Sequence, residues 1–217
     1  MLKFGEFPPA GLSDIAVGDH DDIYVTLRRG AVQKFSAEGK SLFVWDDDRF
    51  RHADAIAVDA TGNVYVADSE NPCVRKFTAD GQFLLEWGAE GSGDGQFKKR
   101  IDDIALDDAG NVYVVDYFNY RIQKFTPDGR FLLKWGAEGT GDGQFRGFGG
   151  IAVDAVGNVF VVDNKVCQVQ KFSPDGHFLL KWGWCGLFVV PWGIAVDAAG
   201  KVYVMDQVNG VQVFAVQ

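Results

Sequence analysis

NVYVVDYFNYRIQKFTPDGRFLLKW, residues 111–135, occurs in three clear copies and two degenerate ones along the chain. The other clear copies are residues 63–87, NVYVADSENPCVRKFTADGQFLLEW, and residues 158–182, NVFVVDNKVCQVQKFSPDGHFLLKW. A short apolar run precedes each copy; in chain order these runs are Ile-Ala-Val, Ile-Ala-Leu and Ile-Ala-Val. A repeat of this kind decides the architecture before any single residue is interpreted, because each copy must form the same supersecondary unit.

Each copy contains four segments that are rich in Val, Ile, Phe, Tyr and Trp and suited to strands, which we call a, b, c and d. In the third copy they are predicted at residues 104–107, 112–116, 121–125 and 130–135. Gly110 in the a–b turn can adopt a positive φ angle without steric cost. Pro127-Asp128-Gly129 suits a tight c–d hairpin. Four antiparallel strands in a repeat of about 40 to 48 residues predict a β-propeller blade.

Five aligned isoleucines begin five such repeats, but the fifth ends without a d strand. Leu2–Gly5 is similar to the Leu-Leu-Lys-Trp-Gly that closes the third and fourth copies, so we expect this strand to complete the last blade and remove an open sheet edge. The prediction is an all-β, single-domain propeller of five four-stranded antiparallel blades, residues 1–217, and a closed ring predicts a monomer. The expected blades are 12–45, 53–87, 101–135, 148–182 and 191–217 with strand 1–5.

The pattern I-A-V-D, D-x-x-G-N-V-Y-V-x-D, N-x-R-[IV]-Q-K-F and D-G-x-F-L-x-x-W-G resembles the NHL repeat. The resemblance covers nearly the whole chain and is weaker at both ends, where Leu27 replaces the Asp of strand b and the Asn-x-Arg element is absent. It implies a propeller that acts as an interaction module for proteins or, in some members, RNA. Members are most often six-bladed, so five repeats imply a five-bladed ring, a piece of a longer chain, or an open ring completed by association. The N-terminal strand favours the first.

Composition limits the function classes. The chain is 47% apolar and 24% charged, as in ordinary soluble proteins, and has no apolar run long enough for a membrane helix. No basic and apolar leader is visible in MLKFGEFPPAG, which predicts a cytoplasmic protein without membrane contact. A net charge of −9 argues against nucleic-acid binding. The three cysteines have no CxxC spacing, so we expect all of them to be reduced.

Connection order places the b–c loops and the d–a linkers on one face, which we call the loop face. Loops on a rigid scaffold are where binding residues usually collect. One b–c loop carries the candidate partner-binding residues Tyr117, Phe118, Asn119, Tyr120 and Arg121. Tyr and Arg often dominate binding at interfaces, although packing of one blade on the next is an equal alternative.

The d–a linker from Trp184 to Trp192 is apolar where its counterparts, residues 89–97 and 137–145, are polar and glycine-rich. Such a linker is either buried against the fifth blade or exposed as a contact patch. We expect burial, because Pro191-Trp192-Gly193 fits a linker entering a strand. Trp184 and Trp192 are the candidate binding residues if the patch is exposed.

Two sets of acids adjoin the loop face. Asp14, Asp54, Asp102 and Asp103 precede a strands and could hold calcium or another divalent cation at the mouth of a central channel, although solvated acids and loop caps are the simpler interpretation. The second set ends strand b in four blades and is expected to anchor loops: Asp68, Asp116, Asp163 and Asp206.

The function predicted from these features is a non-catalytic binding scaffold that presents the loop face to a protein, a peptide or a small ligand, with no required cofactor. The alternative is a metal-dependent lyase or hydrolase, because propellers related to the NHL type hold a cation for lactone hydrolysis or for cleavage of carbinolamide-type bonds. In that case Asp54, Asp102 and Asp103 would ligate the ion, and His52 is the nearby imidazole that could act as a base.

Overall fold

The computed structural model describes residues 11–18, 21–28, 30–46 and 49–216. The chain divides into two compact units, Met1–Ile101 and Asp102–Gln217, and each is described by itself. The described elements are β-strands and one turn of 3-10 helix, η2, at Tyr117–Asn119. No helix within the described ranges is long and apolar enough to cross a membrane.

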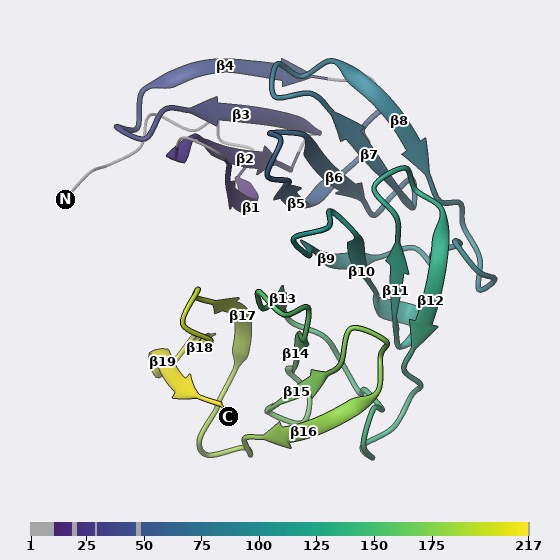
Figure 1. Ribbon diagram of the computed structural model, residues 1–217, viewed down its shortest axis with the longest axis vertical. Helices are drawn as coiled ribbons and strands as arrows, with labels where there is room; N and C mark the ends of the chain where they lie inside the picture. The colour runs from purple at the N-terminus through teal and green to yellow at the C-terminus, as the bar shows by residue number, and fades with distance from the viewer. Residues whose placement is uncertain (1–10, 19–20, 29, 47–48, 217) are drawn as a thin grey trace. The chain divides into compact units, whose positions relative to one another are not determined.

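The first unit contains two four-stranded antiparallel sheets, in which spatial order follows chain order (Figure 1). The first sheet comprises β1 (Leu12–Val17), β2 (Ile23–Leu27), β3 (Ala31–Phe35) and β4 (Ser41–Asp46). The second comprises β5 (Ala53–Val58), β6 (Val64–Asp68), β7 (Cys73–Phe77) and β8 (Phe83–Trp87). These are the first two blades.

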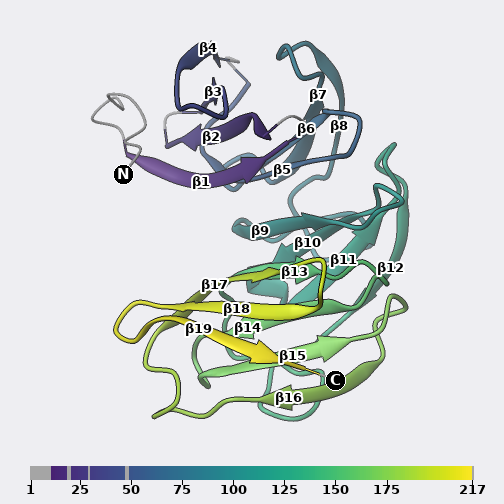
Figure 2. The same ribbon diagram turned by 60° about the vertical axis from the view of Figure 1, so that its left-hand side comes forward.

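The second unit contains the remaining three sheets, apart from Ile101 at the start of β9. Blade 3 comprises β9 (Ile101–Leu106), β10 (Val112–Asp116), β11 (Arg121–Phe125) and β12 (Phe131–Trp135). Blade 4 comprises β13 (Ile151–Val153), β14 (Val159–Asp163), β15 (Gln168–Phe172) and β16 (Phe178–Trp182). Blade 5 has three described strands, yellow-green to yellow in Figure 2: β17 (Pro191–Val196), β18 (Lys201–Asp206) and β19 (Gly210–Ala215).

The five antiparallel sheets confirm the predicted all-β fold, a five-bladed β-propeller. In blade 3 the predicted b and c strands coincide with β10 and β11, whereas strand a begins three residues earlier, at Ile101. The strand expected at residues 1–5 lies outside the described residues, so closure of the last blade by that strand stays a prediction.

Local chemistry explains why each repeat folds alike. In the a–b turn of blade 3, the Asp107 carboxylate accepts the backbone N–H of Asn111 at 2.8 Å, and Gly110 has a φ of 77°. The same Asp-x-x-Gly turn ends the a strand of blade 4, where Asp154 accepts the backbone N–H of Asn158 at 2.7 Å. The repeated Asp and Gly are therefore required by turn geometry.

The core lies around the b and c strands, which are buried along their whole length in blade 3. The d strand alternates between half-buried and exposed residues, as expected for a strand covered on one face. Trp135 of this strand meets Tyr113 edge-on at 6.2 Å and Phe172 of blade 4 at 5.7 Å. The equivalent Trp45 and Trp182 make the same kind of contact, which confirms that the repeated tryptophans pack neighbouring strands and blades.

Candidate functional site

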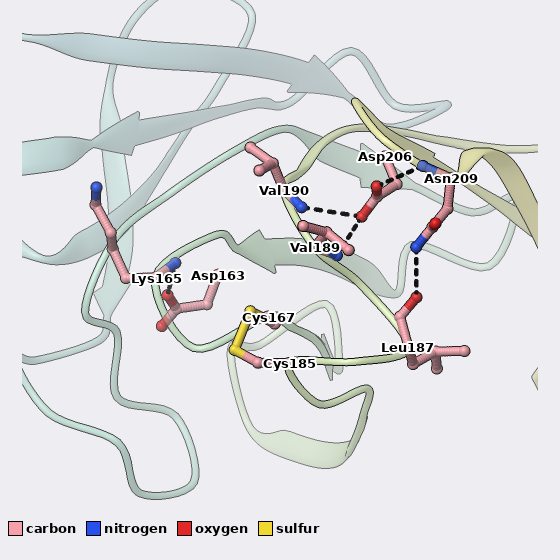
Figure 3. Close-up of a disulfide and its surroundings, with 9 residues drawn as sticks. All are labelled: Asp163, Lys165, Cys167, Cys185, Leu187, Val189, Val190, Asp206 and Asn209. Atoms are coloured by element: carbon pink, nitrogen blue, oxygen red, sulfur yellow. Dashed lines mark hydrogen bonds between the residues drawn. A yellow bond between two sulfur atoms is a disulfide. The ribbon is translucent and has the colours of Figure 1, made fainter.

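The aspartate that ends strand b fastens two loops of the loop face at once. One Asp206 oxygen accepts the backbone N–H groups of Val189 (2.6 Å) and Val190 (3.1 Å) in the linker into blade 5, and the other accepts that of Asn209 (2.9 Å) in the b–c loop (Figure 3). The second oxygen also accepts the N–H of Val208, at 2.9 Å. Burial acts to raise the Asp206 pKa, but these N–H donors stabilise the charged form and hold its pKa below the ordinary value.

The same arrangement occurs in other blades. Asp68 accepts the backbone N–H of Arg51 (2.8 Å) in the preceding linker, and Asp163 accepts that of Arg146 (2.8 Å). In blade 3, Asp116 pairs with Arg121 at 2.8 Å. The prediction that these aspartates anchor loops is confirmed, and it explains why a residue type so costly to bury recurs at this position.

A disulfide joins Cys167 in the b–c loop of blade 4 to Cys185 in the linker that leaves that blade (Figure 3). The prediction that all three cysteines are reduced is therefore wrong for these two. They are 18 residues apart in sequence, but both segments lie on the loop face, which brings the two Cα atoms to 5.0 Å. Cys73 is free and buried, and burial raises the pKa of its thiol to about 12. The cytoplasmic location stays a prediction.

The apolar linker is buried only in part, so the expectation of burial holds for some of its residues and fails for others. Phe188 is fully buried and packs on Phe214 of blade 5. Trp184 is 65% exposed and Trp192 is 41% exposed. The Val189 side chain is exposed as well. Its backbone N–H donates to Asp206.

Val208, in the b–c loop held by the same Asp206, is also exposed. We call Trp184, Val189, Trp192 and Val208 the apolar linker surface. The sequence reasoning missed Val189 and Val208. The sequence did contain one signal of this surface: Val208 is apolar, whereas the equivalent positions of two other b–c loops carry the charged residues Glu70 and Lys165.

The b–c loop of blade 3 is mostly structural. Arg121 is buried against Asp116, and the Asn119 side-chain amide donates to the same carboxylate at 2.8 Å. Tyr117 packs on Phe148 at 6.0 Å. Tyr120 has a left-handed backbone and is half-buried. Of the five predicted residues, Phe118 alone has an exposed side chain, at 44%.

The acids predicted as cation ligands fall into different units. The two carboxylate oxygens of Asp103 accept the backbone N–H groups of Ile104 and Ile151, both at 2.8 Å, and so link blades 3 and 4. Asp102 neighbours it in the second unit. Asp54 lies in the first unit, where its Oδ1 is 2.6 Å from Nδ1 of His52. Among the described residues, no group of three or more His, Cys, Asp or Glu side chains is arranged to hold a metal ion.

Asp14 performs in the first unit the linking role of Asp103 in the second. Its two oxygens accept the backbone N–H groups of Ile15 (2.8 Å) and Ile56 (2.9 Å). Burial raises the Asp14 pKa above its ordinary value. These carboxylates are therefore joints between successive a strands.

Residues 50–77, which span most of blade 2, match the family model of the NHL repeat. No curated protein matches the chain in sequence. Solved structures that resemble it include a streptogramin B lyase (16% identity, TM-score 0.71, covering 97% of this chain and 70% of that one). Another is virginiamycin B lyase from Staphylococcus aureus (13% identity, TM-score 0.69, 95% and 70% covered).

A protein of unknown function from Bacteroides caccae is also similar (12% identity, TM-score 0.66, 90% and 70% covered). At these identities the likeness concerns the fold alone. The repeat match and the five blades together fit an NHL-repeat propeller.

Proposed function

We propose that this chain, whose repeat and five blades fit the NHL-repeat propeller family, is a binding module that takes an apolar segment of a protein or peptide on the apolar linker surface. The observation that carries the proposal is the exposure of Trp184 and Trp192 on one linker. Exposed tryptophans that are held in place are the side chains that most often dominate binding at interfaces.

The linker is held firmly, which favours binding over mere exposure. The disulfide ties Cys185 next to Trp184, Phe188 is buried, and Asp206 accepts two N–H groups just before the a strand of blade 5. A segment held at three points loses little conformational entropy when a partner binds, so less of the interaction energy is offset.

Comparison with the sibling linkers supports a specific role for the two tryptophans. Trp184 takes the place of Ala137, and Trp192 takes the place of Gly149. The small residues fold well in the equivalent linker of blade 4, so large aromatic side chains are not needed for the linker itself. Trp184→Ala and Trp192→Gly therefore return the linker to residues that the repeat tolerates.

The test is selection of peptides from a displayed random library on the oxidised protein, followed by measurement of Kd. We expect the selected peptides to be rich in apolar side chains and to bind the Trp184→Ala, Trp192→Gly double variant at least about tenfold more weakly, the loss typical of a binding hot spot. Leu179→Ala, an exposed apolar change in β16, is the matched control. Equal binding to the double variant would refute the proposal.

A lyase or hydrolase is the second candidate function, favoured by the contact of His52 Nδ1 with Asp54 at 2.6 Å. A carboxylate so placed fixes the orientation of the imidazole and leaves its other nitrogen to act as a base. The two solved lyases share the fold, which is analogy and carries less weight than the site. Thermal-shift titration of chelator-treated protein with calcium, magnesium, manganese and zinc tests the metal-dependent form. A shift abolished by Asp54→Asn would support it, and no shift with any ion would count against it.

A further inference from the structure

A pocket of about 450 Å³ opens on blade 2, within the first unit, whereas the residues of the apolar linker surface belong to the second unit. Six polar residues line it: Arg49, Arg51, Glu70, Asn71, Arg75 and Glu86. Its volume is within the range of small-molecule sites, but its lining is charged where most such sites are apolar. The pocket therefore suits a small, strongly polar ligand.

Arg75 is the residue that distinguishes this blade. The repeat places Gln at the same position of strand c in the other four blades, at residues 33, 123, 170 and 212. In blades 4 and 5 this Gln fastens the incoming linker, since Gln170 donates to the carbonyl of Gln144 (2.7 Å) and Gln212 to that of Leu187 (2.9 Å). Blade 2 lacks this clamp.

The linker into blade 2 is also short. Four residues separate Trp45 from the buried Phe50, whereas nine separate Trp87 from Phe97 at the equivalent place. The longer linker folds back through a bridge between Glu90 and Phe97. A shorter linker and a missing clamp explain why a pocket lies above strand c of blade 2.

The floor of the pocket is a neutralised guanidinium. Arg75 is fully buried and donates to Asp68 (2.9 Å) and Glu86 (2.6 Å), while its guanidinium stacks 5.1 Å from the ring centre of Phe50. Two carboxylates and a stacked ring fix this side chain in one position. The floor is rigid and contributes no net positive charge to a ligand.

The walls carry charge of both signs. Arg51 and Glu70 are exposed, and neither side chain forms an ion pair or hydrogen bond with another of the described residues. Asn71, next to Glu70, adds an amide that can donate and accept. The lining has three arginines and two glutamates, and Asp68 beneath Arg75 adds a third carboxylate, so the charges of these described residues balance.

We propose that this pocket binds a zwitterion of the amino-acid class, either a free α-amino acid or a short peptide with both termini charged. Arg51 receives the carboxylate, because a guanidinium fork matches the two carboxylate oxygens. Glu70 receives the ammonium group, and Asn71 has hydrogen bonds to offer a peptide group. A simple anion would be repelled by Glu70, and a simple cation would be repelled by Arg51.

The test uses ligands matched in shape and different in charge. Free amino acids and L-alanyl-L-alanine are screened against the whole chain by saturation-transfer NMR, and the best binder is then titrated beside its N-acetyl and its C-terminal amide derivatives. We expect each cap to weaken binding by about tenfold or more, the effect of one lost charge-assisted hydrogen bond. In Arg51→Gln the amide should bind as well as the free acid, and in Glu70→Gln the acetylated form should bind as well as the free amine.

Arg146→Gln is the matched control, since Arg146 occupies the place of Arg51 in the linker into blade 4 and pairs with Glu138. This variant should bind as the unaltered protein does. Both pocket changes are on exposed side chains, and an unchanged melting temperature will show that the fold is kept. Absence of binding, or a capped ligand that binds the unaltered protein as tightly as the zwitterion, would overturn the proposal. Loss of peptide binding at the apolar linker surface would leave this result unaffected, so the two proposals fail separately.

Discussion

Reduction of the Cys167–Cys185 disulfide should lower the free energy of unfolding by about 3 kcal/mol. The bond closes a loop between residues 18 apart in sequence. The chain-entropy relation for a loop of that length gives about 11 cal/mol/K, or about 3 kcal/mol near room temperature. The reduced protein should remain folded, because Phe188 stays buried and Asp206 still accepts the N–H groups of Val189 and Val190.

The assay is denaturant unfolding with and without a thiol reductant, beside thiol titration of the unfolded protein. We expect one reactive thiol, from Cys73, before reduction and three after it. The Cys167→Ser, Cys185→Ser double variant should unfold at the midpoint of the reduced protein and show no response to reductant. Three thiols without reductant, or a midpoint that reductant does not move, would refute the reasoning.

Two other predictions concern buried charged or ionisable groups. Asp68→Asn should lower the free energy of unfolding by about 3–5 kcal/mol, because it leaves the buried Arg75 with Glu86 as its one remaining carboxylate partner. Asp80→Asn, in an exposed hairpin, is the control and should cost almost nothing. Equal denaturation midpoints for the two variants would contradict this prediction. Burial raises the Cys73 pKa from its ordinary 9.0 to about 12, so the unfolded thiol ionises first and stability falls as pH rises through that window. Cys73→Ala should flatten this fall in melts at successive pH values, and native Cys73 should resist alkylation at about pH 8; rapid labelling would count against its burial.

The blades were predictable because the repeat makes its demands locally. The Asp-x-x-Gly turn at Asp107 and Gly110 and the alternation in Phe131–Trp135 each fix a piece of the blade within about ten residues of chain. The anchoring role of Asp206 could also be predicted, since it recurs at the end of strand b in four blades.

The remaining features depend on contacts between loops that are distant in sequence. Cys167 and Cys185 have no recognisable spacing, and only the meeting of a b–c loop with a linker brings them together. The exposure of Trp184 could not be read from its apolar neighbours, because Phe188 in the same linker is buried. The pocket over Arg75 had two sequence signals, the departure from Gln in the repeat and the short linker before Phe50.

The most direct test of the binding proposal is an NMR titration of the isotope-labelled, oxidised protein with a peptide selected on it. The proposal predicts that backbone amide shifts change in residues 183–192 and in the b–c loop at 207–209, where Val208 lies. Shift changes confined to the opposite hairpins, such as residues 107–111 and 126–129, would contradict it.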